Sequence, residues 1–505
     1  MVDTLLRPCA DIGIDAESLI EWRYDIDKQI DHIVLGKGPP GGAWHTFPGA
    51  VRSLSPGTWL ALPPHVGVGM GGGVGIRGRV PARAVAAYCR RYVHACKLQK
   101  YFRNGVTVTH VTRMPPCRSC NPHTKPTNPT FLIHARDVTG HTTHYVCKRL
   151  VLAIGVGDRP NMLKLQSPML NNNMLARDLL VTERGIHVLG KWRLENGVIG
   201  NGVVGNGEIG NGLIGIKEMG NEGEVGASTV MVVGSGVSAA DAVRLARGVG
   251  LNVVHVHRAA ADSLAKLSPV TYPEYCQVYK MMLDGPSGDH QNYIPYPEHA
   301  VLDITPAPQN TPTHRNDDLL TLKKVKLINL RSNQTVEVTV SLIAVLIGSK
   351  PDLFFLQSNL DTNLDIHTNL DTTTNTQCIK CIKKQEEDQK QCFIKNHWHY
   401  IKNVLEQSIQ ICKSKYLNYE INGNEKECIM GEFGGFEGDG VGWGVEMGKA
   451  VDGRGNPLAV FGDSHEARRV EGVYALGPLT ADNFMRFIPG GAVAIVSHIH
   501  KQRDN

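Results

Sequence analysis

The most constraining feature of the sequence is a glycine-rich turn in mid-chain, placed directly after a short apolar run. Residues 229–233 are continuously apolar or β-branched, as expected of a parallel strand buried on both faces. Gly234, Gly236 and Ala239 then follow in a G-x-G-x-x-A pattern. The first glycine permits a tight turn, the second lets a pyrophosphate approach the backbone, and the small third residue lets the next helix pack on the strand. The segment therefore predicts the first strand, turn and helix of a dinucleotide-binding unit.

The residues after this turn indicate which dinucleotide is bound. Asp241 falls in the first helical turn, where it suits the positive end of the helix dipole, and a second strand is expected over residues 253–256. An NAD site places an acidic residue about 20 positions after the glycines, where it binds the ribose hydroxyls. Here His257 and Arg258 stand in that place. Basic side chains favour a 2′-phosphate, so we expect NADPH. A strand-to-helix turn that binds nothing is the alternative.

Length and charge limit the classes of partner. A chain of 505 residues predicts two or three domains. The formal net charge is only +5, and no block of Lys and Arg stands alone, so nucleic acid is not an expected partner. No apolar run approaches the roughly 20 residues of a membrane span, and Asp3 and Arg7 stand where a secretory signal would be apolar. We expect an intracellular, soluble, most simply cytoplasmic protein with no transmembrane segment.

The twelve cysteines do not predict a disulfide framework in so long a chain. Two C-x-x-C pairs exist, Cys117 with Cys120, followed by His123, and Cys378 with Cys381. They lie far apart in polar segments, and neither has a second half at zinc-finger spacing. We expect reduced thiols and no metal, with a zinc site or a redox pair as the alternative.

Two segments have a composition that is not typical of a core. Residues 196–215 are four consecutive five-residue NGxxG repeats. Because Asn-Gly is a turn signal, a flexible insertion is favoured over a small solenoid. Residues 358–456 begin with near-repeats of Asn-Leu-Asp, pass through a Lys/Gln/Glu-rich part that could hold a helix over 398–414, and end in a glycine-rich tract. This composition is typical of a surface insertion.

Three further apolar runs are expected to be strands that end on glycine. They lie within residues 149–160, 340–352 and 471–499, and end at Gly155, Gly348 and Gly477. Such an ending lets the backbone approach a ligand at the carboxyl edge of a parallel sheet. In the third run, Gly490 and Gly491 are expected to open a final helix, whose N-terminus can face an electron-rich ligand.

A tryptophan-containing turn is expected near the start of the chain. Gly41, Gly42 and Trp44 form a G-G-x-W element directly after a short apolar strand expected over residues 33–35. The element is either part of a nucleotide site or a glycine turn anchored by a tryptophan.

The order of these elements is similar to that of flavin-dependent monooxygenases with two dinucleotide-binding domains. More closely, the chain resembles the oxidative stress-induced growth inhibitor family. The resemblance is carried by blocks between Asp3 and Val496, among them "HIVLGKGPPGGAWH", "GRVPARAVAAYCRRYV", "VVGSGVSAADAV", "YPEYCQVYKMM", "VLIGSKPDL" and "YALGPLTADNFMRFIPGGAVA". The two low-complexity segments take no part in it.

The resemblance implies an α/β fold with two Rossmann-like, three-layer domains that bind FAD and NADPH. The expected division is 1–165 for an FAD-binding-like domain completed by 457–505, 166–228 for a linker with the NGxxG repeats, 229–357 for the NADPH-binding domain and 358–456 for a low-complexity insertion. Members of the family carry an FAD fingerprint before the position equivalent to Asp3, and this chain begins after it. The first domain is therefore expected to lack its initial β-α element.

The resemblance also implies a site and a reaction. The expected cofactor-binding residues are Gly41, Gly42, Trp44, Gly155, Gly234, Gly236, Ala239, Arg258, Gly348, Gly477, Asp482, Gly490 and Gly491. NADPH at Gly234, Gly236 and Arg258 would deliver hydride to FAD, and the reduced flavin would activate oxygen for attack on a nitrogen, a sulfur or a ketone. No catalytic side chain and no metal are assigned.

Two functions remain open from the sequence. The first is an NADPH- and FAD-dependent monooxygenase-like enzyme linked to growth and division under oxidative stress. The second is a catalytically weak or inactive nucleotide-binding regulator, which the expected lack of the first fingerprint favours. The chain also lacks an F-x-G-x-x-x-H motif after Pro160 and an asparagine within "SLSPGTWLALP", which the monooxygenases carry. A disulfide reductase would need a cysteine pair early in the flavin domain, and neither C-x-x-C lies there.

Overall fold

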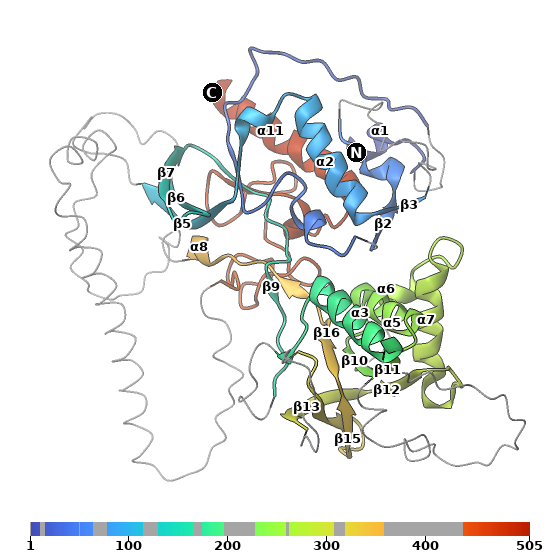
Figure 1. Cartoon of the computed structure of the whole chain (residues 1–505). Coiled ribbons are helices and arrows are strands. Elements are labelled where there is room, and N and C mark those ends of the chain that lie inside the picture. Colours follow the sequence, from blue (N-terminus) through green and yellow to red (C-terminus); the bar gives the residue numbers. More distant parts are fainter. Residues whose placement is uncertain are drawn as a thin grey trace, which may run out of the picture. The chain divides into compact units, whose positions relative to one another are not determined.

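The computed structural model in Figure 1 describes residues 2–10, 16–49, 51–63, 78–114, 130–165, 174–195, 228–258, 262–307, 319–357 and 438–504. The chain divides into two compact units. Unit 1 comprises Met1–Asn104 and Val156–Lys350, and unit 2 comprises Gly105–Gly155 and Pro351–Asn505. The NGxxG repeats, both C-x-x-C pairs with His123, and the helix expected over 398–414 lie outside the described residues.

The centre of unit 1 is a four-stranded parallel sheet in the order β12-β11-β10-β16. Its strands are β10 (Thr229–Val233), β11 (Asn252–His257), β12 (Tyr293–Pro297) and β16 (Leu342–Val345). Every residue of β10 and β16 is buried, because layers cover both faces of the sheet. The glycine turn leads from β10 into α5 (Val237–Gly248). The strand, turn, helix and second strand predicted from the sequence are thus confirmed.

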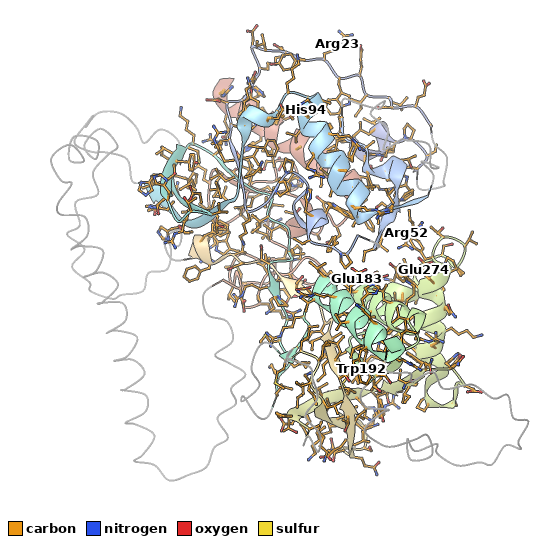
Figure 2. All side chains as sticks on the ribbon, viewed as in Figure 1. Arg23, Arg52, His94, Glu183, Trp192 and Glu274 are labelled. Carbon is orange, nitrogen blue, oxygen red and sulfur yellow. The ribbon has the colours of Figure 1, made fainter. Side chains whose placement is uncertain are left out.

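Helices cover one face of this sheet, and a second sheet covers the other. α3 (Leu179–Glu195), α5, α6 (Asp262–Ala265) and α7 (Pro273–Asp284) lie on the first face, where Figure 1 shows them in green and Figure 2 shows Trp192 on α3 and Glu274 on α7. An antiparallel sheet of β13 (His299–Pro306), β14 (Lys323–Asn329) and β15 (Thr335–Val340) lies on the second. Side chains alternate along β10, so Val232 packs toward the helices and Met231 toward the second sheet. The result is a three-layer α/β arrangement.

The rest of unit 1 is built from short strands and one longer helix. β1 (Val34–Gly36) pairs in parallel with β4 (Phe102–Asn104), and β2 (Arg52–Pro56) pairs antiparallel with β3 (Arg79–Pro81). β9 (Arg159–Pro160) pairs antiparallel with β17 (Ser349–Lys350). The remaining helices are α1 (Val2–Leu6), η2 (Gly42–His45), η3 (Gly57–Leu60), α2 (Ala82–Ala95), η4 (Gln99–Tyr101) and η7 (Gly285–Ser287). Among the described strands, β4 alone pairs with β1.

Unit 2 holds a three-stranded antiparallel sheet and a short parallel pair. The sheet is β5 (Val106–Met114), β6 (Thr130–Asp137) and β7 (Thr142–Cys147). The pair is β8 (Leu150–Leu152) with β18 (Val473–Ala475). Its helices are α8 (Phe354–Gln357), η8 (Gly477–Thr480), η9 (Met485–Phe487) and α11 (Ile488–Asp504). The sequence predicts that Gly490 and Gly491 open the final helix. α11 begins two residues earlier, at Ile488, so both glycines lie within its first turn.

The end of the expected low-complexity insertion is packed rather than loose. Trp443 and Val451 are almost completely buried in unit 2. Gly440 has a φ of +67°, and a Cβ there would lie 2.5 Å from Cδ1 of Leu353. Glycine in this tract therefore permits close packing, whereas composition alone favours a surface segment. Among the described helices, none has the length and apolar character that a membrane span requires.

Candidate dinucleotide site

The glycine turn is shaped so that only glycine fits its first position. Gly234 has a φ of +134°, and a Cβ there would lie 2.3 Å from the carbonyl oxygen of Leu346. Gly236 caps α5, and Ala239 is fully buried where the helix meets the sheet. The first-turn amides of α5 thus lie at the carboxyl edge of the sheet. Free amides and the positive end of the helix dipole suit an anionic pyrophosphate there.

Two other predicted residues follow neighbouring strands at the same edge. Arg258 comes directly after β11, next to β10 in the sheet, and its side chain is exposed. Gly348 follows β16 on the other side of β10, has a φ of +91°, and its carbonyl accepts a 3.0 Å hydrogen bond from the Asn161 N–H. Because parallel strands end at one edge, Gly234, Arg258 and Gly348 lie along the same edge of the sheet.

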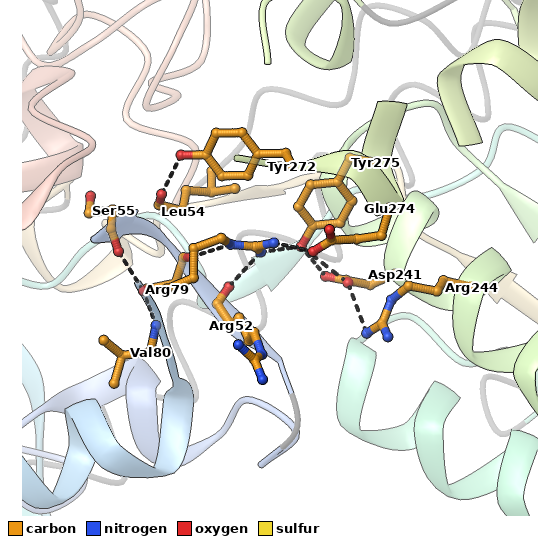
Figure 3. A network of polar contacts seen from close by, with 11 residues as sticks. Arg52, Leu54, Ser55, Arg79, Val80, Asp241, Arg244, Tyr272, Glu274 and Tyr275 are labelled. Carbon is orange, nitrogen blue, oxygen red and sulfur yellow. Dashed lines mark hydrogen bonds and ion pairs between the residues drawn. The ribbon is translucent and has the colours of Figure 1, made fainter. Parts of the chain in front are cut away.

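A polar network links the β2–β3 pair to the helices beside this edge (Figure 3). Its centre is Arg79, whose side chain is only 7% exposed. The guanidinium lies 5.0 Å from the ring centroid of Tyr272 and 4.8 Å from that of Tyr275, and it pairs with Glu274 on α7. It also donates to two carbonyl oxygens of β2. Arg79 therefore joins the β2–β3 pair to α7 and to the residue that caps this helix.

The network ends at Asp241 in α5. The Tyr275 hydroxyl accepts from Arg79 at 2.9 Å and donates to the Asp241 carboxylate, with both oxygens 3.2 Å away. Asp241 is buried, and this burial raises its pKa although Arg244 and Arg79 act to lower it. Burial also raises the pKa of Tyr275 to about 12. The sequence predicts Asp241 as a first-turn acid, but α5 begins at Val237 and its first turn holds no acidic residue, so Asp241 lies just beyond that turn. The sequence did not predict this network, because its partners lie far away along the chain.

A buried histidine lies beside the glycine turn and was not among the predicted site residues. His255 in β11 has no exposed surface, its Nε2 lies 2.7 Å from the Gly234 carbonyl oxygen, and its Nδ1 lies 2.8 Å from the Tyr293 hydroxyl. Burial is the main reason that its pKa falls to about 3. Since a carbonyl can only accept, the neutral ring carries its proton on Nε2, and Nδ1 accepts from Tyr293. The sequence signal that could have marked it is a histidine within the otherwise apolar run 253–256.

The G-G-x-W element forms a 3-10 turn shortly after β1. Gly41 has a φ of +114° and Gly42 of +49°, and Trp44 lies in η2 itself. A Cβ on Gly41 would lie 3.1 Å from Cβ of Cys89 in α2. Gly41 therefore allows the turn to pack closely against this helix, whereas a Cβ on Gly42 would meet nothing within 4 Å.

The predicted residues of unit 2 lie around the ends of β8 and β18. Gly155 and Gly477 follow these adjacent parallel strands, with φ of +70° and +73°. The Gly477 carbonyl accepts from the Asp482 N–H at 3.1 Å, and burial raises the pKa of the Asp482 carboxyl. A Cβ on Gly491 would lie 3.0 Å from Cε1 of His465, so the first turn of α11 packs on this imidazole. Among these residues, His465 is the one that the sequence did not predict.

Known sequences match this chain along nearly its whole length. Oxidative stress-induced growth inhibitor 1 of Mus musculus is 26% identical over 518 residues, which cover 99% of this chain and 80% of the mouse protein. Oxidative stress-induced growth inhibitor 2 of Homo sapiens is 25% identical over 530 residues, covering 98% and 78%. The chain is similar to the oxidative stress-induced growth inhibitors over nearly its whole length. The resemblance predicted from its motifs is thus confirmed, although no family model matches the chain.

Solved structures show the fold of this chain. A bacillithiol disulfide reductase from Bacillus cereus superposes with a TM-score of 0.51 and 13% identity, over 94% of this chain and 93% of the reductase. A second, from Staphylococcus aureus, superposes with a TM-score of 0.50. The α/β fold with Rossmann-like layers that the sequence predicts is therefore confirmed.

Proposed function

We propose that this chain is an NADPH- and FAD-dependent, monooxygenase-like oxidoreductase linked to the control of growth under oxidative stress. NADPH binds within residues 229–357, and FAD binds through residues 1–165 and 457–505. The observation that carries the proposal is the Gly234 turn with Arg258 exposed on the adjacent strand end. The link to growth and oxidative stress comes from the names of the related proteins.

The residues around Gly234 fit a phosphorylated dinucleotide. The Leu346 carbonyl fills the space that a side chain at Gly234 would need, so the turn packs directly against the backbone that follows β16. The first-turn amides of α5 bind the pyrophosphate, and Arg258 binds the 2′-phosphate as a cation at the end of β11. Gly348 follows β16 with a φ of +91°, a conformation that glycine adopts without strain, and its carbonyl is held by the Asn161 N–H.

The residues proposed for FAD lie at two places. Gly41, Gly42 and Trp44 form the turn after β1, and Asp482 with the first turn of α11 lies after β18. The positive end of α11 favours an electron-rich ring. When bound, FAD supplies the hydride-accepting and oxygen-activating chemistry. The protein orients it and excludes water.

A catalytically weak nucleotide-binding regulator is the second candidate, and the strand pairs favour it. Within the described residues, β1 pairs with β4 alone and β8 with β18 alone. Val34 of β1 is 37% exposed and Val151 of β8 is 43% exposed, whereas parallel strands are normally buried on both faces. NADPH binding is therefore better supported by this structure than FAD binding.

One purification separates the candidates. The visible spectrum of the purified full chain is recorded before and after NADPH is added, and NADP⁺ binding is measured by calorimetric titration. A flavin band that bleaches with NADPH supports the enzyme. A colourless chain that gains no band with added FAD, yet binds NADP⁺, supports the regulator. A chain that binds neither cofactor contradicts both.

A further inference from the structure

Both backbone polar groups of Gly234 are bonded to the neighbouring strand β11. Its N–H donates to the Val256 carbonyl at 3.0 Å, and its own carbonyl accepts from His255 Nε2 at 2.7 Å. His255 in turn accepts from the hydroxyl of Tyr293 on β12 at 2.8 Å. One chain of hydrogen bonds therefore crosses three adjacent strands and ends at the first glycine of the turn.

This bond determines how the next peptide is oriented. In a trans peptide the C=O and the following N–H point in opposite directions. Because the Gly234 carbonyl points at His255, the Ser235 N–H points away from it. A glycine at this φ has wide freedom to rotate if nothing holds its carbonyl. The imidazole thus removes a rotation that would reorient the amides at the start of α5.

The placement of His255 excludes direct contact with a ligand. The side chain has no exposed surface, and its neighbours include Tyr293 and His257, with ring centroids 5.7 Å and 5.1 Å away. Its two nitrogens are both engaged, one as donor and one as acceptor, and the ring stays neutral throughout the physiological pH range. An apolar residue here would leave the Gly234 carbonyl and the Tyr293 hydroxyl to find other partners in a dry interior.

We infer that His255 is a positioning residue for dinucleotide binding, which with Tyr293 fixes the Gly234 carbonyl and hence the pyrophosphate-binding amides. The inference rests on the NADPH site proposed above and deepens it. The His255–Gly234 bond then acts on pyrophosphate binding, which NAD⁺ and NADP⁺ share, and Arg258 acts on the 2′-phosphate, which only NADP⁺ carries. Losing the first should weaken both nucleotides, and losing the second should weaken NADP⁺ alone.

The test compares NADP⁺ with NAD⁺, which share the pyrophosphate and differ in the 2′-phosphate. His255→Leu should weaken the binding of both by the same factor, about tenfold, because a buried acceptor loses its donor. His255→Gln, whose amide offers a donor and an acceptor, should restore much of the affinity for both. Arg258→Ala is the matched control and should weaken NADP⁺ alone. Affinities are measured by calorimetric titration of the full chain, with the melting temperature of each variant recorded.

Because a buried leucine at 255 can prevent folding, Tyr293→Phe supplies a second variant. It keeps the bond from His255 to Gly234 but removes the hydroxyl that donates to His255 Nδ1, and should weaken the binding of both nucleotides a few fold. If folded His255→Leu or Tyr293→Phe binds both nucleotides like wild type, the inference is overturned while the NADPH site stands. A loss confined to NADP⁺ overturns it too. Wild type that binds neither nucleotide instead contradicts the proposed function.

Discussion

The two proposed nucleotide halves differ in how completely their strands are paired. In the nicotinamide half, residues 229–357, β10 lies between two parallel neighbours and is buried at every position. In the flavin half, represented by the pairs β1–β4 and β8–β18, each described strand has one strand partner. Both halves carry glycines with positive φ at strand ends. At Gly234 the carbonyl of Leu346, at a neighbouring strand end, fills the space that a Cβ would need, whereas a Cβ on Gly477 after β18 would meet nothing within 4 Å.

This difference shows that a glycine at a strand end does not by itself make a rigid phosphate-binding turn. A Cβ on Gly155, after β8, would meet nothing within 4 Å. At Gly234, by contrast, strands on both sides contact the turn and determine its shape. We therefore expect the nicotinamide half to bind its cofactor independently of the flavin half, and the same change to have unequal effects in the two.

The largest expected effect comes from replacing one glycine in each half with alanine. Gly234→Ala meets a backbone carbonyl at 2.3 Å and a φ of +134°, so it should abolish NADP⁺ binding and cost more than about 3 kcal/mol of folding free energy. Gly155→Ala meets only the φ of +70° and should cost about 1–2 kcal/mol. Urea denaturation and NADP⁺ titration measure both. Equal costs at the two sites would remove the distinction between the halves.

The next effect tests whether the polar network around Arg79 stabilises the nicotinamide half. Arg79→Ala removes the partner of Glu274, the donor to Tyr275 and two contacts with aromatic rings. The free energy of unfolding should fall by about 2–3 kcal/mol. Arg83→Ala on α2, an exposed arginine, is the control and should change it by less than about 0.5 kcal/mol. Chemical denaturation measures the free energy of unfolding of both variants. Equal values would show that the network contributes nothing to stability.

Acid should weaken the nicotinamide half through His255. Its pKa is depressed from 6.5 to about 3, so below pH 6.5 the unfolded chain binds a proton that the folded chain does not. The contribution of the neutral His255 to the free energy of unfolding is fully present above pH 6.5. It is lost as the pH falls, so that the free energy of unfolding is lower by about 2 kcal/mol at pH 5. His255→Gln has no such group. The stability difference between wild type and this variant is measured by denaturation at pH 7 and pH 5, and a difference that stays constant would contradict the prediction.

The last comparison uses one substitution made on a strand of each half. Val232→Thr places a hydroxyl in the fully buried β10 and should cost about 1–3 kcal/mol. Val151→Thr in β8, where the side chain is 43% exposed, should change stability by less than about 0.5 kcal/mol. Denaturation curves of the two variants are compared directly. A cost at Val151 as large as that at Val232 would show that β8 is as enclosed as β10.

The sequence by itself determined the local units of this protein. The apolar run 229–233, the glycines and the small residue Ala239 specify a strand, a turn and a packed helix, because each depends on residues only a few positions apart. The same holds for the strands that lead to Gly155, Gly348 and Gly477. Periodicity and turn chemistry are local properties, so a single sequence can reveal them.

Only the tertiary structure decided which distant residues support these units. His255 meets Gly234 and Tyr293 because three parallel strands lie side by side in one register, and Arg79 reaches Asp241 only through Tyr275 on another helix. The packing of Trp443 within a glycine-rich tract has the same origin. Such contacts join residues far apart along the chain, and their energy depends on burial and geometry that no local pattern carries.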